Sequence, residues 1–357
     1  MIIDFFQPPP GQRVGGLDLA IKSLEKFLIG SGIVVRANPP KEAIGQSGEQ
    51  EVVHFHGLWQ PAFPRLGAHC RRVRVPYVVS PHGMLEPWAW RHKWWKKWPY
   101  FFVVERRFLQ NANRLVATSQ IEAHTLKKFF PGSNATILPL GIAEERLPNY
   151  AEARKALAWG ESEAIILFLS RIHPKKGLPL LLQALARLHS ESSPQSLRVV
   201  IVGGGKESYI RQLKDFIRKH QTELPRIDWV GEVWGEGKWS YLQGADLFCL
   251  PSYSENFGYA VLEALQVGTP VLTTSKTPWS EIESWGAGYL VEPNENAVAS
   301  ALRQFFASRF DVASNHRESI AARIHREFSW KALIGKYLKF YADLAADPAA
   351  RILADER

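Results

Sequence analysis

Two glutamates eight positions apart, Glu255 and Glu263, have the spacing and surroundings that best suit chemistry. They flank Asn256-Phe257-Gly258, which follows the apolar segment 246–250 and begins a short helix. Backbone N–H groups at a helix N-terminus attract anions, and Gly258 permits close backbone approach. Such a glutamate pair is ordinarily solvated surface, so a functional interpretation depends on what neighbouring segments supply.

Two cations follow a second apolar segment, 164–169. Arg171 and Lys176 lie on the short turn after it, placed to converge on a diphosphate, which Arg binds as a fork and Lys as a compact charge. A third apolar segment, 198–202, ends in the glycine turn 203–205. Ligands bind beyond the carboxyl ends of strands in open parallel sheets, so these turns predict an anion-binding site.

Short apolar segments alternate with amphipathic stretches along the chain, which predicts parallel sheets of right-handed βαβ units. A length of 357 residues suits two domains. The charged, Pro-containing stretch 143–155 is the natural hinge. We predict α/β domains at 1–145 and 146–330, followed by a helical tail, 331–357, that crosses back to the first. The expected strands are 2–6, 32–36, 52–55, 77–80, 114–117, 136–139, 164–169, 198–202, 228–230, 246–250, 270–273 and 288–291.

The charge is unevenly distributed. The formal net charge is +9, and residues 1–145 carry 18 Lys and Arg against 11 Asp and Glu. A basic half indicates an anionic partner: nucleic acid, a phosphorylated ligand or an acidic lipid surface. Cys70 and Cys249 form no disulfide or zinc pattern, and no apolar run is long enough to span a membrane. We therefore expect a cytoplasmic protein.

These motifs together resemble the retaining glycosyltransferases of the GT-B fold, known as family 4 or group 1. Their fingerprint is Glu, seven residues, Glu, preceded by an Arg and a Lys before Gly, and it stands here as Glu255…Glu263 with Arg171…Lys176-Gly177. The resemblance implies an α/β architecture of two doubly wound, Rossmann-like domains facing a central cleft. Weaker matches extend over nearly the whole chain: Gly15-Gly16, Ser80-Pro81-His82-Gly83, Ala117-Thr118-Ser119 and 138–142.

The resemblance also implies roles. Arg171 and Lys176 would neutralise the donor diphosphate and stabilise the leaving nucleotide. Glu263 would hold the ribose hydroxyls, and Glu255, with the backbone of Asn256, Phe257 and Gly258, would hold the transferred sugar. His82 would face that sugar. The other implied contacts are Gly16 and Gly203 at the donor, Val230 and Glu232 at the base, and His56 and Trp59 on the acceptor side.

No metal or other cofactor is expected. Fixed cations can stabilise the departing diphosphate, and the resemblance implies that the leaving phosphate itself helps to deprotonate the acceptor. The chain also lacks Asp-x-Asp, the metal-binding signature of the rival GT-A fold.

The segment 88–100 holds five tryptophans and four Lys or Arg, with no acid. One interpretation is peripheral docking on an anionic membrane, because Trp favours the membrane interface and basic residues favour anionic headgroups. A second is a helix whose inner face packs Trp94, Trp98 and 101–102. A third is base stacking on nucleic acid, which nothing else in the sequence supports.

We predict a retaining transferase that moves a hexose from a nucleotide-diphosphate sugar to a glycan or lipid-linked acceptor. The expected setting is cell-surface polysaccharide or glycolipid synthesis at the cytoplasmic membrane face. The alternatives are a nucleotide-sugar epimerase on this fold, and a catalytically silent protein that binds membrane or nucleic acid. The intact donor residues argue against the silent protein.

Overall fold

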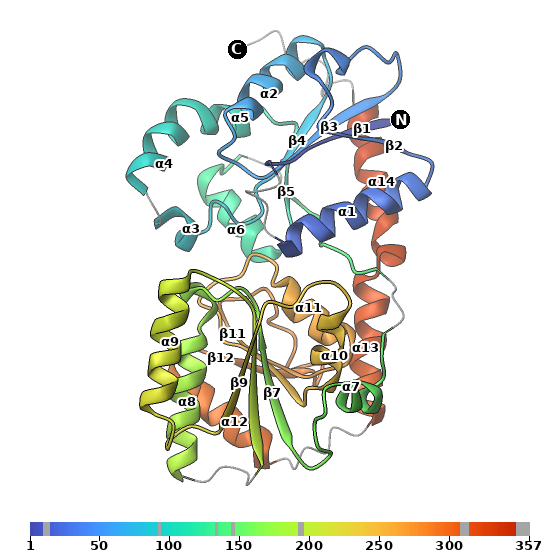
Figure 1. Cartoon of the computed structure of the whole chain (residues 1–357). Helices are drawn as coiled ribbons and strands as arrows, with labels where there is room; N and C mark the ends of the chain where they lie inside the picture. The colour runs from blue at the N-terminus through green and yellow to red at the C-terminus, as the bar shows by residue number, and fades with distance from the viewer. Residues whose placement is uncertain are drawn as a thin grey trace. The chain divides into compact units, whose positions relative to one another are not determined.

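The computed structural model describes residues 1–9, 15–91, 94–132, 135–143, 147–191, 196–307 and 314–347 (Figure 1). The chain divides into two compact units. Unit 1 is Met1–Ala143 together with the chain from Phe328 onward, and unit 2 is Glu144–Glu327. Each unit contains a six-stranded sheet with helices around it. The predicted boundary between 145 and 146 lies outside the described residues, and so does 348–357 of the predicted tail.

Unit 1 has a parallel sheet in the order β2-β1-β3-β4-β5-β6. Its central strands are buried, as the apolar runs predict for strands covered on both faces. The chain runs from β1 to β2 on one side and then continues with β3 on the other side of β1, so the strand order reverses between β1 and β3. The bounds are β1 Ile2–Phe6, β2 Val34–Ala37, β3 Glu51–His56, β4 Tyr77–Ser80, β5 Arg114–Ala117 and β6 Ala135–Ile137.

Unit 2 has a second parallel sheet in the order β12-β11-β10-β7-β8-β9. The chain runs from β7 through β8 to β9, and then returns to the other side of β7 with β10. The order therefore reverses between β7 and β10. The bounds are β7 Ala164–Leu169, β8 Leu197–Val202, β9 Arg226–Gly231, β10 Leu247–Leu250, β11 Val271–Thr274 and β12 Gly288–Val291.

Helices connect the strands in both units. None of those that the structure describes is both long and apolar enough to cross a bilayer. Unit 1 contains α1 Gly15–Gly30, α2 Ala62–Arg72, α3 Pro87–Arg91, α4 Trp94–Tyr100, α5 Arg106–Gln110, α6 Gln120–Phe129 and α14 Trp330–Ala346. Unit 2 contains α7 Tyr150–Ala156, α8 Leu178–Glu191, α9 Glu207–Lys219, α10 Gly237–Gly244, α11 Tyr259–Gln266, α12 Glu295–Ala307 and α13 Ser314–Phe328.

Helix α14 packs on unit 1 although it is the last helix that the structure describes. It lies beside α1 (Figure 1), and its Trp330 and Tyr341 join Phe5 in one buried cluster. The Ile142 N–H donates to the Phe328 carbonyl at 2.9 Å, and the Trp330 N–H donates to the Ile142 carbonyl at 3.1 Å. The chain therefore leaves and re-enters unit 1 through hydrogen-bonded neighbours.

Between α4 and α5 the chain forms a π-helix, Phe101–Glu105. Phe101 is buried, whereas Trp94, Trp98 and Phe102 are exposed. The interpretation that these four aromatics share an inward face is therefore wrong for three of them. Consecutive side chains point in different directions around a helix, so Phe101 faces the core while Phe102 faces solvent.

Candidate active site

The carboxyl ends of β7 and β10 lie where the strand order of unit 2 reverses. The two strands pair directly, with Leu247 opposite Ile166, while the connections that follow them run to opposite sides of the sheet. Such a reversal leaves a crevice beyond the strand ends, which is where ligands bind in open α/β sheets. Arg171 and Lys176 follow β7, and Glu255 follows β10.

An ion pair joins these two turns. Lys176 Nζ lies 2.6 Å from Glu255 Oε1, and the Ser252 hydroxyl donates to the same oxygen at 2.7 Å. Burial acts to raise the pKa of Glu255, but the charge of Lys176 and its hydrogen bond, with smaller contributions from Lys175 and Ser252, hold the pKa below its usual value. Glu255 is therefore a buried carboxylate that stays ionised at neutral pH.

The backbone conformation and the close packing at residue 177 explain why a glycine follows Lys176. The φ of Gly177 is 72°, and a Cβ there would lie 2.0 Å from the Pro251 carbonyl oxygen. The turn after β7 thus packs backbone against backbone on the turn after β10, and the Tyr253 N–H donates to the Lys175 carbonyl at 2.8 Å. Any side chain at 177 would push the turns, and the ion pair, apart.

The turn that carries Arg171 packs on the glycines after β8. A Cβ on Gly203, whose φ is 142°, would lie 1.8 Å from the Ser170 carbonyl oxygen, and the Ile172 N–H donates to the Gly204 carbonyl at 2.7 Å. Arg171 itself is exposed, and its guanidinium forms no ion pair with any residue that the structure describes. It is therefore available to an anion from solution.

Val230 and Glu232 lie beside this turn, at the end of β9 and just after it. Val230 is exposed, and Glu232 accepts a hydrogen bond from Trp234 Nε1 at 3.2 Å. The Glu232 carboxylate covers Gly204, where it occupies the space that a Cβ would need. The structure thus brings Gly203, Val230 and Glu232 to the same edge of the sheet as Arg171. The donor contact of Gly203 and the base contacts of Val230 and Glu232 stay predictions.

Helix α11 carries the second glutamate. Gly258 precedes it with a φ of 75°, and the Phe257 carbonyl accepts from Trp279 Nε1 at 2.8 Å, which fixes the helix start. Glu263 is buried and pairs with Lys238 of α10, with Nζ 2.6 Å from Oε1. Sequence reasoning missed Lys238, because the strands and motifs say nothing about which residue of α10 faces α11.

Three imidazoles of unit 1, those of His54, His56 and His82, form a stack at the carboxyl ends of β3 and β4. His56 Nδ1 lies 3.1 Å from His82 Nε2, and the rings of His54 and His56 are stacked with centroids 4.0 Å apart. His54 also contacts the Tyr341 hydroxyl and the Ser80 hydroxyl, each at 2.7 Å. Helix α14 is therefore tied to the residues that precede the His82 turn.

Burial keeps these imidazoles neutral. It lowers the pKa of His82 to about 3, and together with the neighbouring rings of His54 and His82 it lowers the pKa of His56 well below its usual value. His82 is partly exposed as a residue, yet its Nδ1 is buried. At neutral pH these rings can exchange hydrogen bonds with a hydroxyl, but they carry no charge.

Glu122 holds the His82 turn and was not predicted. One carboxylate oxygen accepts from the Gly83 N–H at 2.6 Å, and the other accepts from the N–H and the hydroxyl of Thr118, at 2.8 and 3.0 Å. Burial raises the pKa of Glu122 to about 7, although these bonds oppose the shift. The pattern Ser119-x-x-Glu122, in which Ser119 caps α6, is the signal that draws attention to this residue.

Trp59 and Gly16 complete the predicted residues of unit 1. Trp59 has a φ of 65°, and its N–H donates to Glu105 Oε1 at 3.0 Å. Lys97 Nζ lies 5.5 Å from the centre of the Trp59 ring. Gly16 lies in the first turn of α1, and the chain just before that helix is outside the described residues. Trp59 is therefore held by its backbone beside a cation.

Two family models match the chain. Residues 149–325 match Glycosyl transferases group 1, and residues 41–146 match Glycosyltransferase Family 4. The chain belongs to the family 4 glycosyltransferases. The first match covers the Arg171, Lys176, Glu255 and Glu263 constellation, and the second covers both histidines of the His56 and His82 pair.

Curated relatives of this glycosyltransferase include a D-inositol 3-phosphate glycosyltransferase of Nocardia farcinica, 32% identical over 67% of this chain and 54% of that protein. A phosphatidyl-myo-inositol mannosyltransferase of Mycobacterium leprae is 27% identical over 84% of this chain and 75% of that protein. The chain thus spans about half the length of the first of these relatives.

Solved structures establish the fold of this family 4 member as GT-B. Sucrose-phosphate synthase from Thermosynechococcus elongatus superposes with a TM-score of 0.76 at 19% identity, covering 97% of this chain and 99% of that one. Anabaena HepE in complex with UDP-glucose superposes with a TM-score of 0.71 at 17% identity, covering 96% and 99%. The predicted α/β architecture of two doubly wound domains is confirmed.

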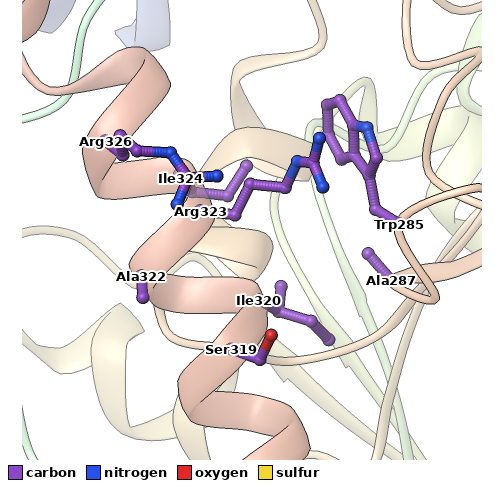
Figure 2. A pocket seen from close by; sticks show the side chains of 8 residues that line it. All are labelled: Trp285, Ala287, Ser319, Ile320, Ala322, Arg323, Ile324 and Arg326. Atoms are coloured by element: carbon purple, nitrogen blue, oxygen red, sulfur yellow. The ribbon is translucent and has the colours of Figure 1, made fainter.

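The glycosyltransferase has a cavity of about 170 Å³ elsewhere in unit 2 (Figure 2). It lies between α13 and the chain just before β12, where Arg323 is placed over the Trp285 ring at 4.8 Å. Figure 2 shows Arg323 reaching from α13 toward Trp285. The residues that line this cavity include none of the predicted donor contacts.

Proposed function

We propose that this glycosyltransferase moves a hexose from a nucleotide-diphosphate sugar to a glycan or lipid-linked acceptor, with retention at the anomeric carbon. The observation that carries the proposal is the Lys176–Glu255 pair at the strand-order reversal of unit 2, beside the exposed Arg171. Names of relatives supply the ligand classes. Two relatives are named for D-inositol 3-phosphate and phosphatidyl-myo-inositol, and the HepE structure is a complex with UDP-glucose.

The charges suit departure of a nucleotide diphosphate. As the bond from the anomeric carbon to the leaving oxygen breaks, negative charge grows on the diphosphate, and cations fixed beside it lower the barrier. We assign this stabilisation to Arg171 and Lys176 and invoke no metal. Lys176 then divides its charge between Glu255 and the phosphate, so Glu255 is left to accept hydrogen bonds from sugar hydroxyls. Glu263 accepts from the ribose hydroxyls, with Lys238 fixing its carboxylate.

The histidines enter the proposal as neutral partners. With its pKa near 3, His82 is no acid catalyst at neutral pH, and its role is to position a sugar hydroxyl by hydrogen bonding. His56 orients His82 through the hydrogen bond between His56 Nδ1 and His82 Nε2. On the acceptor side, Trp59 offers an aromatic face. The setting that we propose is glycolipid or cell-surface polysaccharide synthesis at the cytoplasmic face of a membrane.

Donor binding is the first test. A thermal-shift screen against UDP-, GDP- and ADP-sugars identifies the nucleotide, because a ligand that binds only the folded state raises the unfolding temperature. With that donor, Glu263→Ala should weaken binding at least tenfold by calorimetry, since a charged hydrogen bond contributes about 1.5–3 kcal/mol. Glu318→Ala, at an exposed site on α13, is the matched control. Equal affinity for wild type and Glu263→Ala contradicts the ribose role.

Turnover is the second test. Arg171→Ala should lower kcat by roughly 10²–10³, the usual cost of removing one group that stabilises developing charge. Arg211→Ala, which removes an exposed arginine of α9, should leave kcat unchanged. A wild-type rate for Arg171→Ala removes this residue from the phosphate role. Incubation of the donor without acceptor separates the epimerase alternative, because only an epimerase returns an isomerised nucleotide sugar.

A further inference from the structure

Large apolar side chains are exposed on α4 and the π-helix that follows it. Trp94, Trp95, Trp98, Phe102 and Val103 are exposed to 58%, 59%, 48%, 47% and 76%. These five, here called the aromatic ridge, are nearly half of the exposed large hydrophobic residues among those that the structure describes. A contiguous apolar surface on a folded unit marks an interaction site far more often than scattered exposed residues do.

The ridge is ordered by its own contacts and by the core beneath it. The rings of Trp98 and Phe102, one turn apart, lie 4.8 Å between centroids, and the Arg106 guanidinium lies 5.8 Å from the centre of the Phe102 ring. Phe101, next to Phe102 in the chain, is buried instead and packs edge-on against Trp90, with ring centroids 5.0 Å apart. The core thus fixes the inner face while the ridge is presented outward. In Figure 1, α4 stands at the left edge of unit 1.

Residues 52–143, the part of unit 1 that carries the ridge, have no exposed acid among the residues that the structure describes. Residues 52–143 contain thirteen Lys and Arg but only three acids, Glu86, Glu105 and Glu122, and all three acids are buried. This stretch holds the four strands from β3 to β6, which are consecutive in the sheet. The cations therefore belong to one continuous half of unit 1, and no exposed acid of that half offsets them. Exposed examples are Arg65, Arg72, Arg74, Arg106, Lys127 and Lys128.

We propose that the aromatic ridge docks unit 1 on an anionic phospholipid bilayer. Tryptophan favours the headgroup level, Phe102 and Val103 can enter the acyl boundary, and the surrounding cations meet acidic headgroups. A bilayer suits this surface better than a nucleic acid does, because it accepts aliphatic as well as aromatic side chains. The inference goes beyond the transferase site, and its test needs no donor, acceptor or turnover.

The test is sedimentation of the full chain with sucrose-loaded vesicles. One set is pure phosphatidylcholine, and the other contains 30% phosphatidylglycerol. At about 0.15 M salt we expect the bound fraction on the anionic vesicles to correspond to a partition coefficient at least tenfold higher than on the neutral ones. The double variant Trp94→Ala/Trp98→Ala should lower the coefficient on anionic vesicles at least tenfold. Trp234→Ala, which removes the 71%-exposed tryptophan of unit 2, is the matched control and should bind as wild type.

A charge variant separates the contribution of the cations to membrane binding from that of the aromatic ridge. Arg106→Gln/Lys127→Gln should reduce binding to anionic vesicles severalfold and leave the weak binding to neutral vesicles unchanged. All these side chains are exposed, so thermal unfolding should match wild type and exclude misfolding. Equal binding by wild type and the tryptophan variant, or no binding to anionic vesicles, overturns the proposal. So does binding of a single-stranded oligonucleotide, or self-association through the ridge, when vesicle binding is absent.

Discussion

Replacing Lys176 by methionine keeps an unbranched side chain and removes the charge that faces Glu255. In wild type the side chains of Lys176 and Glu255 are only 14% and 8% exposed, and their charged atoms lie 2.6 Å apart. Removing one partner of a buried ion pair leaves the other charge buried without its partner, which lowers the free energy of unfolding by about 3–5 kcal/mol. The Ser252 hydroxyl still donates a hydrogen bond to Glu255 in the variant, so we expect the loss of stability to be about 3 kcal/mol, at the lower end of this range.

The assay is thermal unfolding of unit 2 at pH 7.5. For a unit of 150–250 residues each kcal/mol shifts the midpoint by about 2–4 °C, so Lys176→Met should melt roughly 6–12 °C below wild type. Lys175→Met, one position earlier and without this bond, should cost less than about 1 kcal/mol. Adding Glu255→Gln to Lys176→Met should recover most of the loss, because no buried charge then lacks its partner.

The pH dependence provides an independent check. In wild type the pKa of Glu255 is depressed, so its contribution to stability is present above the unfolded pKa and is lost as pH falls through the folded one. In Lys176→Met only burial and weaker contacts act, so the pKa of Glu255 rises and its penalty is relieved on acidification. The gap between the two proteins should therefore narrow from pH 7.5 to 4.5. A midpoint within 2 °C of wild type at pH 7.5, or a constant gap, refutes the reasoning.

Two further predictions concern the turns. Because the pKa of Glu122 is about 7, above its unfolded value, ionisation of Glu122 contributes a loss of roughly 3 kcal/mol to the stability of unit 1 as pH rises from 5 to 8. Glu122→Gln lacks this ionisation, whereas the other titrating groups of unit 1 are common to both proteins, so the difference in midpoint between wild type and Glu122→Gln should change across that range; a constant difference would contradict this. Gly203→Ala places a Cβ against the Ser170 carbonyl at a φ of 142° and should cost roughly 3 kcal/mol in urea unfolding. Gly204→Ala meets only the exposed Glu232 side chain and should cost less than about 1 kcal/mol, so equal losses would disprove the argument.

The strands could be predicted because their signal is local. All twelve predicted strands are present among the described residues, with ends that differ where backbone geometry decides. The segment predicted at 32–36 begins at Val34, because Gly32, with a φ of 83°, belongs to the turn after α1. The segment predicted at 136–139 ends at Ile137, because Pro139 has no N–H to donate to a ladder.

Only those residues of the candidate site that directly follow a strand could be predicted, because ligands bind beyond the carboxyl ends of parallel strands. Lys176 and Glu255 meet because β7 and β10 are neighbours, whereas the alternation of elements indicates only that the carboxyl ends of all these strands lie at one edge of a parallel sheet. Lys238 and Glu122 were missed, because each reaches its partner across helix packing and turn conformation that no residue spacing specifies. The exposure of Trp94, Trp98 and Phe102 was not predicted either, because their regular spacing along a helix does not say whether that face meets the core or solvent.

The return of α14 to unit 1 affects the order in which the molecule is made. Unit 2 is continuous in sequence and can complete its core as soon as the ribosome has released it. Unit 1 cannot complete its core until α14 has been synthesised. Before then Trp330 and Tyr341 are missing, and the apolar side chains around Phe5 are exposed on the nascent chain. Translation halted before residue 330 therefore leaves a finished second unit joined to an aggregation-prone first one, and the shortest self-sufficient version of this protein reaches through α14.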